Sequence, residues 1–162
     1  EGYGPGGVAL FIETLTDNRN RTVSEVRHLF SRHNGNMAES GAVGWIFDQK
    51  GAITVSREIT DEETLMTVAL EAGADDIVEG DGEFEVYTPL QAFDLVRKAP
   101  EENEIAYTRA TLTRIPQNSV QVEGKVAEQL IRLLEALEDQ DDVQNVYANF
   151  EMDDAQLAEL TS

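Results

Sequence analysis

Residues 52–114 decide the fold of this chain, and they read AITVSREITDEETLMTVALEAGADDIVEGDGEFEVYTPLQAFDLVRKAPEENEIAYTRATLTR. Short β-branched runs alternate here with stretches of helical apolar spacing, and glycine-containing turns separate them. The predicted elements are a strand at 52–57, a helix from Thr60 closed by Gly73, a hairpin about Gly80–Gly82, a helix from Thr88 to about Lys98 and a strand at 104–116. This βαββαβ succession predicts a ferredoxin-like unit.

Three capping boxes mark the predicted helix starts. In a capping box, a Ser or Thr before the helix and a Glu or Gln three residues later bond to exposed backbone amides. The boxes are Thr22 with Glu25, Thr60 with Glu63, and Thr88 with Gln91. The first of them predicts an amphipathic helix from Val23 to about Asn34.

The segments flanking 52–114 add up to a second unit of the same kind. Their predicted elements are a strand at 8–15, the helix from Val23, a strand at 43–47, a β-like stretch at 119–123, a helix at 124–138 and a strand at 143–150. Between 43–47 and 52–57, the tetrapeptide DQKG (48–51) is typical of a turn in which Gly51 takes a positive φ.

We therefore predict an α+β fold made of two ferredoxin-like βαββαβ units, one inserted into the other. Residues 1–48 and 116–162 would form a discontinuous outer domain, and residues 49–115 the inserted domain.

The chain begins EGYGPGG, which satisfies the dinucleotide-binding pattern G-x-G-x-x-G. That pattern binds phosphate only where the glycines follow a strand and open a helix. Here the glycines lead into the predicted strand at 8–15. We therefore interpret residues 1–7 as an entry segment and not as a phosphate loop.

The composition of the chain limits the classes of function that it can have. The 162 residues include 32 acidic and 12 basic ones and no cysteine, for a net charge of −20. Such a chain repels nucleic acid as a whole. It has no disulfide framework, and no apolar run approaches the length of a membrane span.

The charge is unevenly spread, because one short stretch is basic. It holds Arg19, Arg21, Arg27, Arg32, His28 and His33, with Glu25 as the opposing acid. One interpretation is that the arginines pair with acids of the inserted domain. The other is an edge that contacts phosphate groups, since guanidinium forks match phosphate geometry.

Catalytic and metal-binding patterns are not found in the sequence. Two histidines five residues apart, without cysteine, match no zinc-ligand spacing. There is no nucleophile-elbow pattern, and paired acids such as Glu62 and Glu63 are typical of solvated faces. We expect no catalytic residue, no metal and no cofactor.

Two stretches carry a family resemblance: EGYGPGGVALFIETLTDNRNRTVSEVRHLFSRHNGNMAESGAVGWIFDQKG (1–51) and LLEALEDQDDVQNVYANF (133–150). They resemble the YebC family, which includes bacterial transcriptional regulators and a mitochondrial translational activator of cytochrome oxidase. The resemblance covers the second and third domains of such proteins. It implies that a basic N-terminal helical domain is absent from this chain and that EGYGPGG is the junction to it.

The resemblance implies a non-enzymatic, DNA-binding transcriptional regulator. Alternatives are a ribosome-associated translation factor and a ligand-sensing regulatory module. The expected partner is DNA or ribosomal RNA, possibly on the ribosome, with no membrane. The expected location is the bacterial cytoplasm, or a mitochondrion or plastid for an organelle-targeted relative. The residues expected to contact nucleic acid are Arg19, Asn20, Arg21, Arg27, His28 and Arg32.

Overall fold

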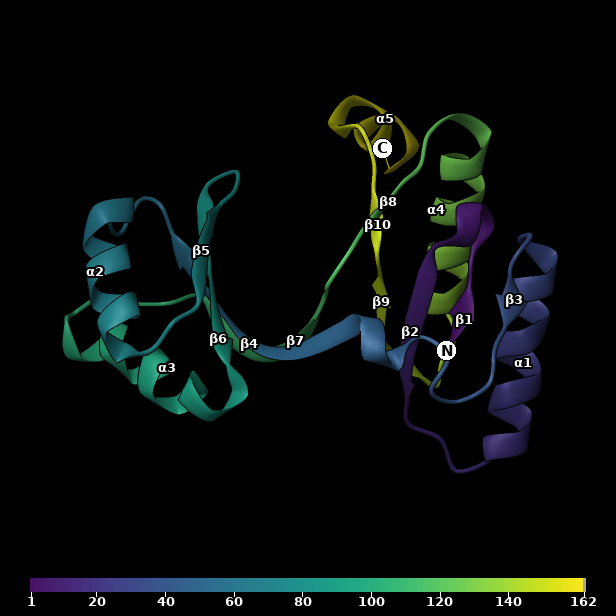
Figure 1. Cartoon of the computed structure of the whole chain (residues 1–162), viewed down its shortest axis with the longest axis horizontal. Helices are drawn as coiled ribbons and strands as arrows, with labels where there is room; N and C mark the ends of the chain where they lie inside the picture. Colours follow the sequence, from purple (N-terminus) through teal and green to yellow (C-terminus); the bar gives the residue numbers. More distant parts are fainter. Residues whose placement is uncertain (162) are drawn as a thin grey trace. The chain divides into compact units, whose positions relative to one another are not determined.

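The computed structural model describes residues 1–161, and its contacts divide the chain into two compact units. The outer unit consists of residues 1–47 together with the part from Pro116 onward, and the inserted unit consists of residues 48–115. Together they contain helices and antiparallel sheets in separate layers, so the predicted α+β class is confirmed (Figure 1).

The inserted unit follows the predicted βαββαβ order. Its elements are β4 (Phe47–Ser56), α2 (Glu62–Ala72), β5 (Asp76–Glu79), β6 (Glu83–Pro89), the 3-10 turn η3 (Leu90–Ala92), α3 (Phe93–Glu102) and β7 (Arg109–Pro116). The strand order is β5-β6-β4-β7, with the first and third strands in the middle, which is a ferredoxin-like arrangement. In Figure 1, α2 and α3 lie on the same side of this sheet.

One apolar layer joins these helices to the sheet. Ile53 and Val55 of β4 and Phe84 and Val86 of β6 alternate toward the helices, as the period of two along a strand requires. They form one buried cluster with Leu65, Ala69, Val96 and Ile105.

Three local predictions for this unit were wrong. Residues 48–51 do not form a turn, because they lie inside the continuous strand β4. The cap of α2 is Asp61 and not Thr60, since the Asp61 carboxylate accepts from the amide of Thr64 at 2.7 Å. Thr88 caps no helix: it belongs to β6, its hydroxyl bonds to the Pro89 carbonyl, and α3 begins only at Phe93.

The outer unit contains the remaining elements. They are β1 (Gly2–Tyr3), η1 (Pro5–Gly7), β2 (Ala9–Thr14), α1 (Arg19–Arg32), β3 (Asn36–Met37), η2 (Gly44–Ile46), β8 (Val120–Gln121), α4 (Gly124–Glu138), β9 (Val143–Ala148), β10 (Phe150–Glu151) and α5 (Asp154–Thr161). Its main sheet has the order β3-β1-β2-β9, and β8 and β10 form a separate parallel pair.

This topology corrects the prediction of a second ferredoxin-like unit. The position beside β2 is taken by β1, because Gly2 pairs with Leu10 and Tyr3 with Ala9. Residues 120–121, predicted for the main sheet, pair with β10 instead, and residues 44–46 form a 3-10 turn instead of a strand.

The glycine-rich opening is therefore part of the fold. A Cβ on Gly2 would lie 2.6 Å from Cζ of Phe30, so only glycine allows the strand to approach this buried ring. Gly6 has a φ of 80°, which lets the chain reverse between β1 and β2.

Two apolar layers enclose the main sheet of the outer unit. Leu10 of β2 packs with Val26 and Phe30 of α1 and with Leu130 and Leu133 of α4. On the opposite face, Ala9 packs with Val43, Ile46 and Phe47 from the segment around η2. The helix α1 is thus held against the sheet by one face, and its other face remains exposed.

Candidate nucleic-acid interface

The helix α1 begins earlier than the capping box predicts. Asn18 is its N-cap, since its side-chain oxygen accepts from the amide of Arg21 at 3.1 Å. Thr22, expected to precede the helix, lies within its first turns and is 2% exposed. The three positions Arg19, Asn20 and Arg21 consequently form the first helical turn.

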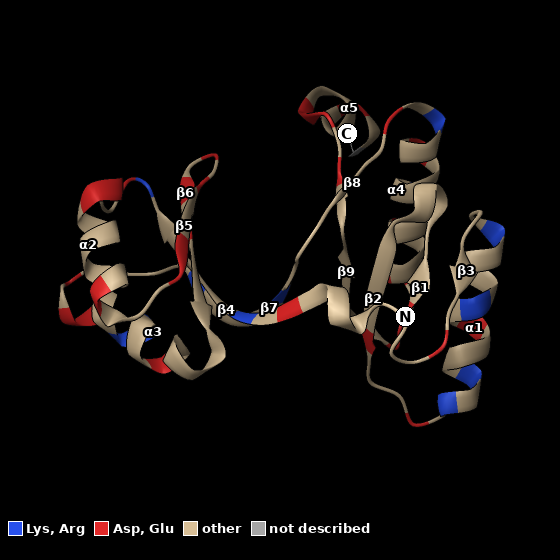
Figure 2. Ribbon diagram, viewed as in Figure 1, with Lys and Arg blue, Asp and Glu red and all other residues tan. Residues whose placement is uncertain are grey.

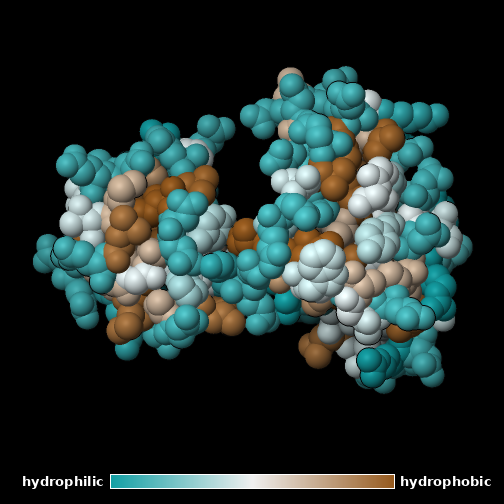
Figure 3. Space-filling model, viewed as in Figure 1, coloured by the Kyte–Doolittle hydropathy of each residue, from teal (hydrophilic) through white to brown (hydrophobic). Residues whose placement is uncertain are grey.

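The six predicted site residues are all exposed on α1. Thr22, Val26 and Phe30 mark the buried stripe, spaced four residues apart. With 3.6 residues per turn, Asn20, Arg27, His28 and Arg32 fall on the side opposite that stripe. Figure 2 shows basic segments recurring along α1 from one end to the other, and hydrophilic side chains predominate in Figure 3 where α1 lies.

Arg21 differs from the others because it is already engaged. Its Nη2 lies 3.2 Å from Oδ2 of Asp142 and 3.4 Å from Oδ1 of Asp17. The hydrogen bond and charge of Asp142 raise the pKa of Arg21. Arg21 therefore pairs with acids of the outer unit and not with the inserted unit.

Asp142 is also held by Thr22. Its Oδ2 accepts from the Thr22 hydroxyl at 2.7 Å. The pKa of Asp142 is lowered chiefly by this hydrogen bond, against the raising effect of its burial, and further by Arg21. The pair fixes the N-terminal turns of α1 to the segment before β9.

Arg19 faces a different direction from the rest of the set. It lines a cavity of about 250 Å³ between the first turns of α1, β2 and β3. Its guanidinium makes no ion pair with any residue in the described range 1–161.

The side chains of Arg27 and Arg32 likewise make no ion pair or hydrogen bond with the described residues. Most basic side chains elsewhere are paired: Arg57 lies 2.6 Å from Glu79, Arg97 3.2 Å from Asp94, and Arg132 2.6 Å from Glu128. Among the lysines of residues 1–161, Lys98 on α3 and Lys125 on α4 are without an ion pair. The unpaired arginines therefore gather on one helix.

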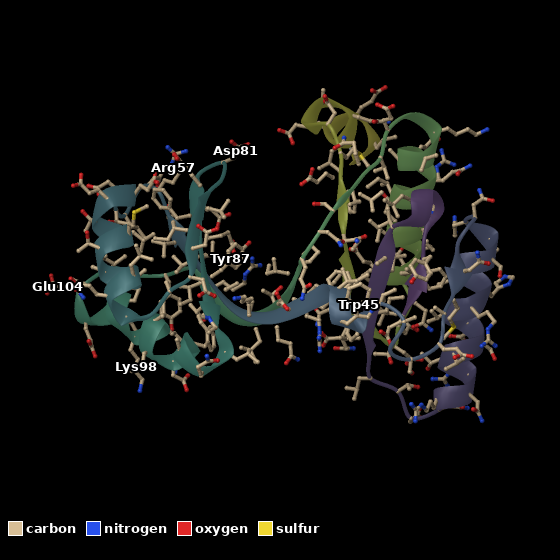
Figure 4. The ribbon with its side chains drawn as sticks, viewed as in Figure 1. Trp45, Arg57, Asp81, Tyr87, Lys98 and Glu104 are labelled. Carbon is tan, nitrogen blue, oxygen red and sulfur yellow. The ribbon has the colours of Figure 1, made fainter. Side chains whose placement is uncertain are left out.

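Exposed aromatic surface was not predicted. Trp45 on η2 is 66% exposed, and its indole N–H donates to the Ala42 carbonyl at 3.0 Å (Figure 4). The sequence signal was the single Trp in a segment expected to be a strand. The Asp142 partnership was also missed, because Asp142 is 121 residues away from Arg21 along the chain.

The described part of the chain has neither a cluster of metal-ligating side chains nor a membrane-spanning helix. Within residues 1–161, no group of three or more His, Cys, Asp or Glu side chains could hold a metal ion. The helices of these residues are all too short or too polar to cross a bilayer.

Comparison with known proteins gives consistent matches. The family model described as TACO1/YebC second and third domain matches residues 1–150. A probable transcriptional regulatory protein of Syntrophus aciditrophicus is 48% identical over 162 residues, which is 100% of this chain and 65% of that protein. A probable transcriptional regulatory protein of Geobacter sulfurreducens is 51% identical over 160 residues, covering 99% of this chain and 64% of that protein.

A solved structure is similar as well. The crystal structure of a conserved hypothetical protein, Aq1575 from Aquifex aeolicus, matches with a TM-score of 0.86 and 42% identity. The match covers 94% of this chain and 63% of that one. This chain thus spans somewhat less than two thirds of the length of the relatives it matches.

Proposed function

Because this chain belongs to the TACO1/YebC family, we propose that it is the part of a bacterial transcriptional regulator that contacts a nucleic-acid backbone through the exposed face of α1. The contact residues are Arg19, Asn20, Arg21, Arg27, His28 and Arg32.

The observation that carries this proposal is the unpaired state of Arg27 and Arg32. In a chain of net charge −20 with 32 acidic residues, exposed arginines have many possible partners. These two nevertheless make no ion pair within residues 1–161, while Arg57, Arg97 and Arg132 do. An exposed guanidinium offers a planar fork that binds phosphate oxygens bidentately.

The contacts of the α1 residues suggest different roles for them in binding. Arg27 and Arg32, with Asn20 and His28 beside them, contact phosphates directly. Arg21 positions the first turn through Asp142 and reaches a phosphate only with its remaining N–H groups. Such contacts fix the position of a strand without reading its bases.

The proposed role is binding and not catalysis, in agreement with the relatives' name of regulatory protein. It requires no metal and no cofactor. A protein that regulates transcription in bacteria acts in the cytoplasm, which is the location we propose.

DNA is the proposed partner, since the relatives are named transcriptional regulatory proteins. Ribosomal RNA is the alternative to test, because backbone contacts through arginine suit either polyanion. A ligand-sensing module is the third possibility, and the cavity beside Arg19 is where a ligand would bind.

A charge-reversal experiment tests the proposal. Arg27→Glu combined with Arg32→Glu is compared with Lys125→Glu combined with Arg132→Glu, which makes the same charge change on exposed positions of α4. Affinity for duplex DNA and for a ribosomal RNA fragment is measured at low ionic strength by fluorescence anisotropy.

We expect the α1 variant to lose about tenfold or more in affinity for one of the two nucleic acids, while the α4 variant loses much less. Equal losses in both variants would mean that only overall charge matters, and the proposed interface would be wrong. Melting temperatures of both variants verify that each is folded.

A further inference from the structure

The cavity next to α1 combines apolar walls with one cation. Its volume is about 250 Å³, and it lies wholly within the outer unit. The apolar wall includes Ile12 of β2, Val23 and Val26 of α1, and Met37 of β3. Such a space accepts a flat apolar body better than it accepts a chain of charges.

The polar groups that line the cavity are of two kinds, hydroxyl groups and charged groups. Thr14 and Ser40 contribute hydroxyl groups that can donate or accept, whereas the Thr16 hydroxyl already accepts from the amide of Asn18 at 3.0 Å. The Glu1 carboxylate also lines the cavity, but its oxygens already accept from the amides of Gly41, Val43 and Gly44. Arg19 remains as the charged group with no ion pair in residues 1–161.

The cavity is continuous with the proposed interface. Arg19, Val23 and Arg27 are spaced four residues apart, so they follow one row along α1. Val23 lines the cavity in the middle of this row, and Arg27 lies beyond it on the exposed side. A strand with one base in the cavity and its phosphate on Arg19 would continue along α1 toward Arg27, which lies about 12 Å further along the helix axis.

We propose that the cavity takes one unpaired nucleotide, with its base against Ile12, Val23 and Met37 and its phosphate on Arg19. The inference rests on the proposed nucleic-acid contact of α1 and specifies its substrate. A base inside a regular duplex is stacked and cannot enter a cavity, whereas an unpaired base in a loop or a melted strand can. The nucleotide can belong to a strand that continues over Arg27 or can be free in solution.

Methionine-methyl NMR tests the inference without a variant. The chain has three methionines, and Met37 lines the cavity, whereas Met66 lies on α2 of the inserted unit and Met152 lies beyond β10. Protein labelled at the methionine methyl groups and with nitrogen-15 at its backbone amides is titrated with a single-stranded hexanucleotide RNA, with a perfectly paired duplex and with a free mononucleotide.

We expect the Met37 methyl signal to shift with the single strand and to stay unshifted with the duplex. The signals of Met66 and Met152 serve as internal controls and should stay in place. If the titration of the Met37 signal gives the mononucleotide the same affinity as the single strand, the natural ligand of the cavity is a free nucleotide. If the single strand binds more tightly, the ligand is a nucleotide within a nucleic acid.

Two variants complete the test. Arg19→Ala should weaken mononucleotide binding by about tenfold through loss of a charge-assisted phosphate contact, and Lys125→Ala, the control on the exposed side of α4, should leave it unchanged. Shifts of α1 backbone amides without any Met37 shift would contradict nucleotide binding in the cavity, but they would be consistent with the proposed nucleic-acid contact of α1. No shift in either place at millimolar ligand would overturn both.

Discussion

At the scale of single residues, Asp142 holds the start of α1 in place. It accepts from the Thr22 hydroxyl at 2.7 Å and pairs with Arg21 at 3.2 Å, and its own amide donates to the Gln140 side chain at 2.6 Å. The Asp142 side chain is 15% exposed, so these bonds are well shielded from water. The geometry of the proposed interface therefore depends on a carboxylate outside α1.

Asp142→Asn is expected to make stability less dependent on pH. The pKa of Asp142 is lowered in the folded state by the Thr22 hydroxyl and, against the effect of burial, further by Arg21. Its contribution is therefore present above the unfolded pKa of about 3.9 and is lost as the pH falls through the lower folded value. In thermal melts the variant should be less stable than the wild type at pH 7, and the difference should shrink below about pH 4.

Asp141→Asn is the matched control. Asp141 is exposed, and its replacement by Asn removes the same charge, so the melting temperature of this variant at pH 7 should stay near that of the wild type. An Asp142→Asn deficit that is equally large at neutral and acid pH would contradict the role assigned to this carboxylate.

Gly51 is a second residue on which the local structure depends. A Cβ at this position would lie 2.2 Å from Cδ1 of Phe93 and 2.6 Å from Oγ1 of Thr88. Gly51→Ala should destabilise the inserted unit by about 1–3 kcal/mol, as overpacking does. Chemical denaturation of Gly51→Ala, Phe93→Ala and the double variant measures the coupling, and the alanine at 51 should cost much less when Phe93 is absent. Additive costs would show that the ring is not the cause.

At the scale of elements, long segments with a clear period could be predicted and short ones could not. The helix at 124–138 was predicted with its observed bounds, because Leu130, Leu133 and Leu137 repeat on one face. The strand β1 was missed, since two residues among glycines carry no period of their own. The tetrapeptide DQKG was predicted to be a turn because its polar residues and glycine are typical of turns. Gly51 is instead a strand residue that leaves room for the ring of Phe93, which lies 42 positions later in the sequence.

In the candidate site, too, some features could be predicted from the sequence and others could not. The exposure of Arg27, His28 and Arg32 followed from the helical spacing of their apolar neighbours. The pairing of Arg21 with Asp142 and the cavity beside Arg19 could not be predicted, because both depend on which distant segments the sheet brings together.

The N-cap of α1 can be tested directly. Asn18→Ala should cost about 1 kcal/mol of unfolding free energy, because it leaves the amide of Arg21 without its acceptor. Ser24→Ala, at an exposed position of the same helix, should change it by less than about 0.5 kcal/mol. Urea denaturation distinguishes the two variants, and equal losses would contradict the assignment of Asn18 as the cap.

At the scale of the whole molecule, we propose that each of the two units folds by itself. The outer unit is discontinuous, but the amide of Gln117 donates to the carbonyl of Ile46 at 2.8 Å, which holds its two cut ends together. Replacing residues 48–115 by a short glycine linker should leave a folded outer unit with a cooperative thermal transition. A product without such a transition, together with an unfolded isolated 48–115 segment, would contradict this proposal.

The net charge of −20 sets the condition under which the α1 interface can be seen. Non-specific affinity comes almost wholly from neutralised phosphates, so we expect the chain alone to bind weakly near physiological salt. The affinity that remains at low salt should then depend on the few arginines of α1 that make no ion pair among the described residues.

The salt dependence of binding measures that contribution most directly. The logarithm of the association constant is followed against the logarithm of salt concentration for the wild type and for Arg27→Ala combined with Arg32→Ala. If both arginines neutralise phosphates, the slope should flatten by about two units in the double variant. An unchanged slope in a folded double variant would show that α1 does not contact the backbone, and would contradict the central claim.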